Sequence, residues 1–187
     1  MKLKSVLAVA ALAVSSAAMA DSSVNVQYFN QKAASGGALS HYTVTGFKTD
    51  LTKNIAIDVA ATQQQADATN LVTNRWETGL SGKLATVGPM SFTLRASTGV
   101  KAKSGVNSFG YYSVEPGVSV ALPAGFTAAY GRRYRDAFDS ANADNSITNR
   151  YTLSYNLTKV DKVSFRVDDV RGDGANKSTG LIYSRSF

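Results

Sequence analysis

The stretch STGLIYSRSF at residues 178–187 decides the fold. Its side chains alternate between two faces. One face holds Thr179, Leu181, Tyr183, Arg185 and Phe187, and the other holds Ser178, Gly180, Ile182, Ser184 and Ser186. A period of two, with large side chains on one side and mostly small or polar ones on the other, predicts a β-strand between two environments.

Nine further segments share this alternation, so we predict ten strands in all. They lie near residues 23–30, 41–51, 54–64, 73–84, 90–101, 108–122, 125–136, 146–157, 162–171 and 177–187. The clearest outward sets are Ile55, Ile57, Val59 and Ala61, then Met90, Phe92, Leu94 and Ala96, then Tyr151, Leu153, Tyr155 and Leu157. Outside residues 1–20, no window shows an apolar stripe at helical spacing.

The connections between these segments alternate in length. Short turns fall at 52–53, 85–89, 123–124 and 159–161, and longer polar loops at 31–40, 65–72, 102–107, 137–145 and 172–176. Short turns on one side and longer loops on the other are typical of transmembrane β-barrels, which have an even number of strands. We therefore predict an all-β, antiparallel up-and-down barrel of about ten strands, with eight or twelve as alternatives. Both chain ends then lie on the periplasmic side.

Residues 1–20 resemble an export signal. Lys2 and Lys4 precede a short apolar run at 6–14, and residues 18–20 form an A-x-A cleavage site. We expect a mature chain of residues 21–187, whose net charge falls from +7 to +5 because both lysines are removed. The chain has no cysteine, which excludes disulfides and Cys-ligated metal sites.

The outward aromatic residues suit a lipid-facing wall. They are Trp76, Tyr112, Tyr134, Tyr151, Tyr155, Phe165, Tyr183 and Phe187. Rings with a polar tip favour the boundary between lipid and water. The alternative is a water-soluble sandwich or lipocalin-like barrel, but such a fold would bury the inward charges in a dry core at high cost.

Three positions disturb the alternation. In the second segment Tyr42 and Val44 face opposite to Phe47 and Leu51, which predicts a bulge near Gly46. Arg132 falls on the outward face, so it either reaches the outer rim or is turned inward by a bulge. Arg185 is also outward, near the periplasmic rim, where a long cation reaches water easily.

An exported chain that closes on a strand ending in Phe187 resembles the small bacterial outer-membrane barrels of the OmpA type. The resemblance covers the whole mature chain and implies integration into the outer membrane. It also implies that Tyr183 and Phe187 belong to the C-terminal signal read by the barrel insertion machinery. The expected partners are that machinery, outer-membrane lipid, lipopolysaccharide and a small anionic solute; nucleic acid is excluded by export.

The inward face carries twelve charged residues. They are Asp58, Arg75, Glu77, Lys83, Arg95, Lys101, Glu115, Arg133, Arg135, Arg150, Arg166 and Asp168. One interpretation is a lumen plugged by salt bridges. The other uses the excess of bases: a positive potential in a narrow tube attracts anions, which arginine binds through its planar fork. We take the pore-lining set as Arg75, Glu77, Arg95, Glu115, Arg133, Arg135, Arg150, Arg166 and Asp168.

A local resemblance favours the second interpretation. The motif YGRRYRD at 130–136, followed by NRY at 149–151, is similar to a strand–loop–strand of the monomeric porins for acidic sugars and oligogalacturonates. The likeness covers about residues 108–157. Those barrels have twelve strands and arginine-lined pores. The resemblance implies that Arg133, Arg135, Arg150 and Arg166 line an anion track.

Catalysis has little support. His41 is the only histidine, and its neighbour Ser40 points to the opposite face of the same strand. We find no metal-ligand spacing and no nucleotide-binding fingerprint, so we expect no catalytic residue, metal or cofactor. Two function classes remain: a porin-like channel for small, anionic solutes, and a non-conducting structural or adhesive barrel whose external loops bind partners.

Overall fold

The computed structural model of the protein describes residues 21–33, 39–67, 71–105 and 107–187. The predicted signal at 1–20 lies outside the described residues, as do residues 34–38, 68–70 and 106 of three predicted loops. The domain boundary after residue 20 therefore stays a prediction.

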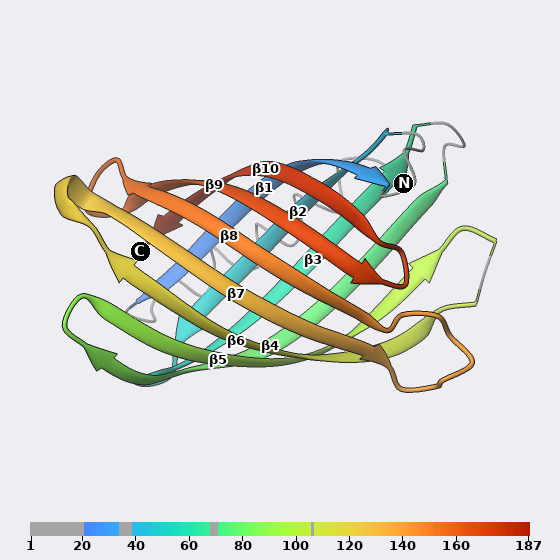
Figure 1. Ribbon diagram of the computed structural model, residues 1–187, viewed down its shortest axis with the longest axis horizontal. Helices are drawn as coiled ribbons and strands as arrows, with labels where there is room; N and C mark the ends of the chain where they lie inside the picture. Colours follow the sequence, from blue (N-terminus) through green and yellow to red (C-terminus); the bar gives the residue numbers. More distant parts are fainter. Residues whose placement is uncertain (1–20, 34–38, 68–70, 106) are drawn as a thin grey trace.

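Ten antiparallel strands form one closed barrel (Figure 1). They are β1 (Ser22–Ala33), β2 (Leu39–Asp50), β3 (Ile55–Ala66), β4 (Val72–Val87), β5 (Met90–Lys103), β6 (Phe109–Ala121), β7 (Phe126–Ala137), β8 (Ser146–Asn156), β9 (Asp161–Gly172) and β10 (Asn176–Ser186). Each strand pairs with its neighbours in the sequence, and β10 closes the sheet on β1. The predicted fold class and strand number are confirmed.

The two ends of the described chain meet at one end of the barrel. The Phe187 N–H donates to the Ser22 carbonyl at 2.9 Å, so the last residue is part of the closing seam. We call this end the terminal end and the opposite one the loop end. No helix in the described ranges is long and apolar enough to cross a membrane.

The connections at the terminal end are residues 51–54, 88–89, 122–125 and 157–160. The described residues of the loop-end connections are 67, 71, 104–105, 107–108, 138–145 and 173–175. Several loop-end connections are shorter than predicted because the strands continue into them. A ladder needs only backbone donors and acceptors, so polar residues such as Gln64 and Gln65 still pair with β2 and β4. The 88–89 turn places Gly88 at φ 56°, a left-handed conformation that glycine adopts without strain.

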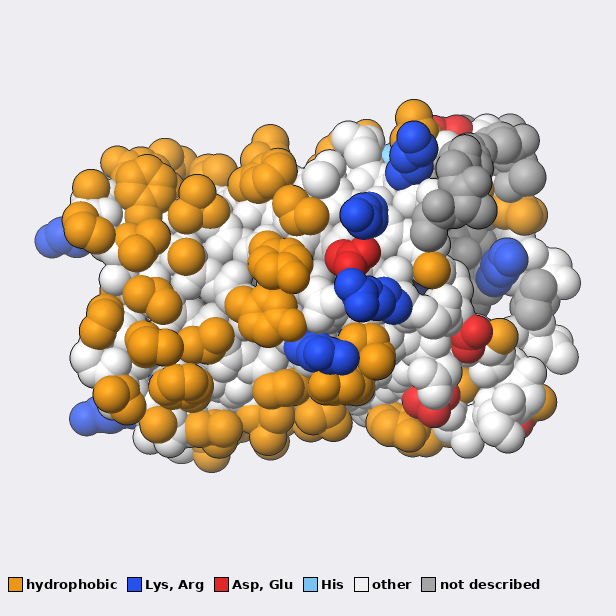
Figure 2. Space-filling view, viewed as in Figure 1, with side chains coloured by type: hydrophobic (Ala, Val, Ile, Leu, Met, Phe, Trp, Pro, Cys, Tyr) orange, Lys and Arg blue, Asp and Glu red, His pale blue; other side chains and the backbone are white. Residues whose placement is uncertain are grey.

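A band of large apolar and aromatic side chains covers the outer wall (Figure 2). All eight aromatic residues predicted to face outward are exposed, between 41% for Tyr155 and 53% for Tyr151. Exposed apolar residues occur on every strand, whereas large contiguous apolar patches are rare on water-soluble monomers. The wall therefore suits contact with hydrocarbon.

The bulge predicted near Gly46 is wrong. The β2 register runs without a break against both β1 and β3, and the irregularity of the sheet lies at Lys83 and Ala85 in β4. Tyr42 and Val44 instead point inward, where they pack with the fully buried Phe29. The alternation failed as a guide here because part of the barrel interior is apolar.

Arg132 keeps the outward direction of its strand. The β7 register is continuous against β8 and keeps the same offset against β6 on both sides of a gap at Glu115 and Pro116. Its guanidinium lies over the Tyr134 ring at 5.4 Å. Arg185 is also outward, and its Nη1 lies 3.6 Å from Asp161 Oδ1 near the terminal end.

Candidate functional site: the barrel lumen

A cavity of about 780 Å³ lies inside the barrel, with side chains from all ten strands around it. It reaches from Lys103 and Asn176 near the loop end to Lys48 in the half of the barrel nearer the terminal end. A second cavity of about 300 Å³ lies at the terminal end and contains Lys83. The two cavities adjoin, because Lys48 and Ser81 line both.

The structure places the predicted pore-lining residues in or beside this space. Arg75, Glu77, Arg95, Arg133, Arg135, Arg150, Arg166 and Asp168 line the larger cavity. Glu115 does not line it, but its carboxylate contacts Arg150. Tyr183 and Phe187 lie on the outer wall, 43% and 52% exposed. Their roles in transport and in insertion stay predictions.

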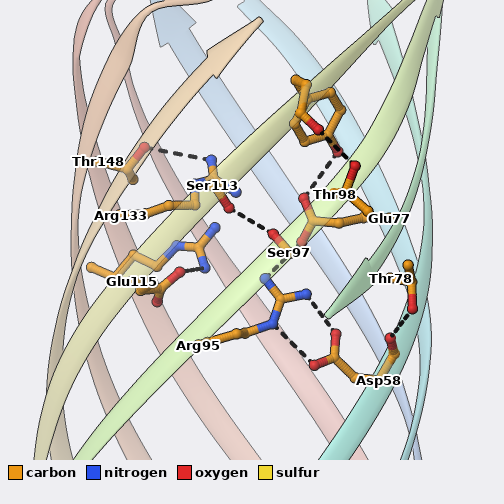
Figure 3. Close-up of polar contacts among 12 residues, drawn as sticks. Asp58, Glu77, Thr78, Arg95, Ser97, Thr98, Ser113, Glu115, Arg133 and Thr148 are labelled. Atoms are coloured by element: carbon orange, nitrogen blue, oxygen red, sulfur yellow. Dashed lines mark hydrogen bonds and ion pairs between the residues drawn. The ribbon is translucent and has the colours of Figure 1, made fainter. Parts of the chain in front are cut away.

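Arg95 forms the centre of the first ion-pair group (Figure 3). Its Nη2 lies 2.5 Å from Asp58 Oδ2, and its Nη1 lies 2.7 Å from Glu77 Oε1. Arg95 belongs to β5 and Asp58 to β3, so the side chain crosses β4. It crosses at Gly79, where a Cβ atom would lie 2.5 Å from Arg95 Nη2.

Arg150 joins the second group on the other side of the lumen. Its Nη1 donates to Glu115 Oε2 at 2.6 Å, and its Nε lies 3.8 Å from Asp168 Oδ2. Asp168 Oδ1 also lies 3.2 Å from Arg166 Nε. Here Glu115 crosses β7 at Gly131, where a Cβ atom would lie 2.9 Å from the Glu115 carboxylate.

The third group was missed by the sequence analysis, because its acid lies in the connection between β7 and β8. Asp144 is only 2% exposed, and its Oδ1 accepts from both Lys101 Nζ and Arg135 Nη2 at 2.8 Å. This connection therefore enters the mouth of the barrel at the loop end. The predicted loop at 137–145 is confirmed as a connection between strands, at 138–145. Asp144 is nevertheless buried, because Lys101 and Arg135 hold its carboxylate inside the barrel.

Arg75 and Arg133 differ from the other lumen arginines. Within the described ranges, neither forms an ion pair with a carboxylate, whereas Arg95, Arg135, Arg150 and Arg166 each do. The Nε of Arg75 and that of Arg133 are also buried without a hydrogen-bond partner, a feature that several other lumen arginines share. The Nη2 of Arg133 donates only a long hydrogen bond, 3.5 Å, to Thr148 Oγ1 (Figure 3). Two guanidinium groups are thus left facing the cavity with unused donors.

The wall formed by β1–β3 is more neutral. Amide and hydroxyl side chains line the cavity there: Asn25, Gln27, Gln31, Thr62 and Gln64. Beside them Phe29 stacks on Tyr42 with centroids 4.7 Å apart and supports the Arg166 guanidinium at 4.3 Å. The lumen thus has a charged side and an amide side.

Inward glycines were the second feature missed by the sequence analysis. Gly79, Gly99, Gly131 and Gly180 each lie beneath a long side chain from a neighbouring strand. Over Gly99, for example, Tyr111 reaches across β5 and donates to Glu77 Oε2 at 2.9 Å. A glycine at an inward position of a strand is the signal that would have found them, because it marks a close approach.

The residues considered for catalysis do not come together. His41 faces outward, where its ring stacks against Tyr28 and its Nδ1 lies 3.0 Å from Asp67 Oδ1. Ser40 accepts a hydrogen bond from Gln64 Nε2, which lines the cavity. Over the described part of the chain, no group of three His, Cys, Asp or Glu residues is arranged to hold a metal ion.

No family model matches the sequence, and no curated protein matches it. Solved structures do resemble the fold. The KdgM porin is 15% identical, with a TM-score of 0.52 over 88% of this chain and 99% of that one. The NanC porin is 12% identical, with a TM-score of 0.61 over 88% and 100%. The COG4313 outer-membrane channel from Pseudomonas putida F1 is 10% identical, with a TM-score of 0.55 over 90% and 96%. The predicted fold is confirmed: the protein is a closed antiparallel β-barrel similar in fold to these outer-membrane porins and channels.

Proposed function

We propose that the protein is an outer-membrane channel that conducts small anionic solutes through its lumen. The observation that carries this proposal is the pair of cavity arginines without an ion-pair partner, Arg75 and Arg133. A cation whose charge is already neutralised cannot bind a passing anion strongly. No carboxylate among the described residues pairs with either of these two, although both line the cavity.

The charge balance of the lumen supports anion preference. Among the described residues, nine basic side chains line the larger cavity: Lys48, Arg75, Arg95, Lys101, Lys103, Arg133, Arg135, Arg150 and Arg166. Four acidic ones line it: Asp58, Glu77, Asp168 and Asp173. Glu115 and Asp144 contact this set from outside the cavity lining and reduce the excess without removing it. A positive potential within low-dielectric walls raises the local concentration of anions.

The chemistry of the lining indicates the class of solute. A guanidinium fork suits carboxylate or phosphate, and the amides opposite suit hydroxyl groups. An acidic sugar has both kinds of group. One structure of the KdgM porin is described as a complex with oligogalacturonate, which makes a sugar acid the first solute to try. The loop end then faces the outside, as in other outer-membrane barrels.

Single-channel recording in planar bilayers tests the proposal. Under a tenfold KCl gradient, an ideally anion-selective pore reverses at about 59 mV, the chloride equilibrium potential. We expect the mature protein to reverse on that side of zero, and Arg75→Gln/Arg133→Gln to move the reversal potential toward zero. Lys159→Gln, in an exposed turn away from the lumen, is the control and should reverse as the unmodified protein does. Cation selectivity of the unmodified protein would refute anion conduction.

The second candidate is a non-conducting structural barrel whose loops bind partners. It is favoured by the ion pairs of Arg95 and Arg150, which neutralise charge along the inner wall, and by Asp144 in the barrel mouth. Absence of unitary conductance from protein shown to be folded would support it. We place an enzymatic role below both, because His41 lies on the outer wall away from the polar lumen.

A further inference from the structure

A row of polar and charged side chains crosses the outer wall over β7, β8, β9, β10 and β1. In the register of the sheet its members are direct cross-strand partners, in the order Arg132, Asn149, Asp169, Lys177 and Lys32. Arg171 points to the same side, two residues beyond Asp169 along β9. We call these six residues the outer basic row. With strands about 4.8 Å apart, the five paired positions span about 19 Å.

The row lies at the border of the apolar band. One step toward the terminal end, the outward residues on the same strands are Tyr130, Tyr151, Val167, Thr179 and Asn30. One further step reaches Ala128, Leu153, Phe165, Leu181 and Tyr28. Figure 2 shows the same sequence from left to right: apolar side chains, then rings, then a group of basic side chains around an acidic one.

The row has a strong excess of positive charge. Its only carboxylate is that of Asp169, whose Oδ2 lies 3.4 Å from Arg171 Nε. Among the described residues, Lys32, Arg132 and Lys177 form no ion pair with a carboxylate. Asn149 is only 8% exposed and accepts from the Tyr130 hydroxyl at 2.9 Å, so it anchors the ring below the row. Three exposed cations remain without a counter-charge from the protein.

Tolerance of single cations near a membrane boundary does not explain the row. A lysine or arginine costs about 0–1 kcal/mol there, so isolated cations could occur anywhere around the barrel. Instead they gather on one side. The described outward positions in the loop-end halves of β4–β6 carry no charge; they include Asn74, Trp76, Thr98, Val100 and Tyr112. Gathering repelling cations in one place implies a negative ligand for that place.

We propose that the outer basic row binds the phosphate groups of lipopolysaccharide. The acyl chains of lipopolysaccharide would pack on the apolar band, and its phosphates would contact Lys32, Arg132 and Lys177 at the border of that band. Arginine binds phosphate oxygens through two parallel N–H groups, and lysine acts as a point charge. Free phosphate would gain nothing from the apolar band, whereas a phosphorylated glycolipid uses both surfaces. The proposal rests on the proposed orientation, in which the loop end faces the outer leaflet.

The experiment compares two matched triple variants of the full mature barrel. Lys32→Gln/Arg132→Gln/Lys177→Gln removes the unpaired cations of the row. The control, Lys53→Gln/Lys159→Gln/Arg185→Gln, removes two lysines and one arginine on the outside of the terminal end. Each folded protein is titrated with diphosphorylated lipid A, with dephosphorylated lipid A and with phosphatidylglycerol, and bound lipid is counted by native mass spectrometry.

We expect the row variant to bind diphosphorylated lipid A about a hundredfold more weakly, since each cation beside an anionic lipid contributes about fivefold. The control should bind as the unmodified protein does, and dephosphorylated lipid A should not distinguish the three proteins. Equal affinity of the row variant and the unmodified protein overturns the proposal. So does equally tight binding of phosphatidylglycerol, because the row would then be a general anionic-lipid surface.

The result is separable from the channel proposal. The row variant leaves the lumen intact, so its conductance and reversal potential should match the unmodified protein. If the row variant loses lipid A binding and the unmodified protein does not conduct, the lipid-binding proposal is supported and the channel proposal is refuted. If the unmodified protein conducts anions and the row variant binds lipid A as tightly as it does, the channel proposal is supported and the lipid-binding proposal is refuted.

Discussion

Replacing Asp144 by asparagine tests how the connection between β7 and β8 is held in the barrel mouth. The Asp144 carboxylate accepts from Lys101 on β5 and from Arg135 on β7, both at 2.8 Å. Asparagine has the same size and keeps one acceptor oxygen but no charge. The change therefore leaves two inward cations without their acid and loosens the contact that anchors residues 138–145 in the mouth.

The magnitude follows from burial. Removing one partner of a buried ion pair typically costs about 3–5 kcal/mol, because the remaining charge stays buried and unpaired. Arg135 is 8% exposed and fits this case. Lys101 is 23% exposed and can regain water, and the asparagine oxygen still accepts one hydrogen bond. We therefore expect Asp144→Asn to lower the free energy of unfolding by about 2–3 kcal/mol.

Two assays follow the substitution. Urea unfolding of the barrel in lipid vesicles gives the free energy of unfolding. Bilayer recording gives the reversal potential. It should move toward the chloride equilibrium potential, because the mouth loses one negative charge and its net charge becomes more positive by one. The matched control is Asp139→Asn in the same connection. Asp139 is exposed. Among the described residues its carboxylate accepts only from the Ala141 N–H, at 3.0 Å, a bond that an asparagine side chain can also accept.

Similar behaviour of the two variants would refute this reasoning. If Asp144→Asn and Asp139→Asn unfold within about 0.5 kcal/mol of each other, the Asp144 contacts do not hold the connection in the mouth. If stability falls but the reversal potential does not move, the ion pairs are structural and lie outside the conducting path.

Two further predictions concern packing and assembly. Gly99→Ala would place a Cβ atom 2.5 Å from the Trp76 carbonyl oxygen and 2.7 Å from the Tyr111 ring, so we expect a loss of about 1–3 kcal/mol in urea unfolding. Gly82→Ala, whose nearest atom lies at 3.9 Å, should stay within about 0.5 kcal/mol, and an equal loss in both would contradict the packing argument. Phe187→Ser should lower the amount of assembled barrel in the outer membrane of cells while the purified protein still folds in detergent. Phe165→Ser, an equally outward substitution within β9, should assemble normally, and equal yields of the two variants would contradict a terminal signal.

The period-two pattern was enough to predict ten strands and the exposed aromatic band. Those features depend on residues close in the chain: Tyr151, Leu153 and Tyr155 face outward because alternate side chains of one strand share a face. The pairing of β10 with β1 followed from the even number of strands and from the need to remove sheet edges. The same pattern failed at Tyr42 and Val44, because alternation distinguishes two faces without showing which is inside when both carry apolar residues.

The sequence by itself determined the inward direction of most charged residues within the strands, since that depends on parity along a single strand. It missed Lys48, Lys103 and the loop acid Asp144. Only the tertiary structure decided which of the inward charges are neutralised. Asp58 and Arg95 are 37 residues apart in the sequence. They meet because the stagger of the closed sheet lets the Arg95 side chain reach from β5 over Gly79 of β4 to β3. The same stagger brings the Glu115 carboxylate to Arg150, and it leaves Arg133 without an ion pair to a carboxylate among the described residues. Register and closure are properties of the whole sheet, so the free charge in the lumen cannot be read from any one strand.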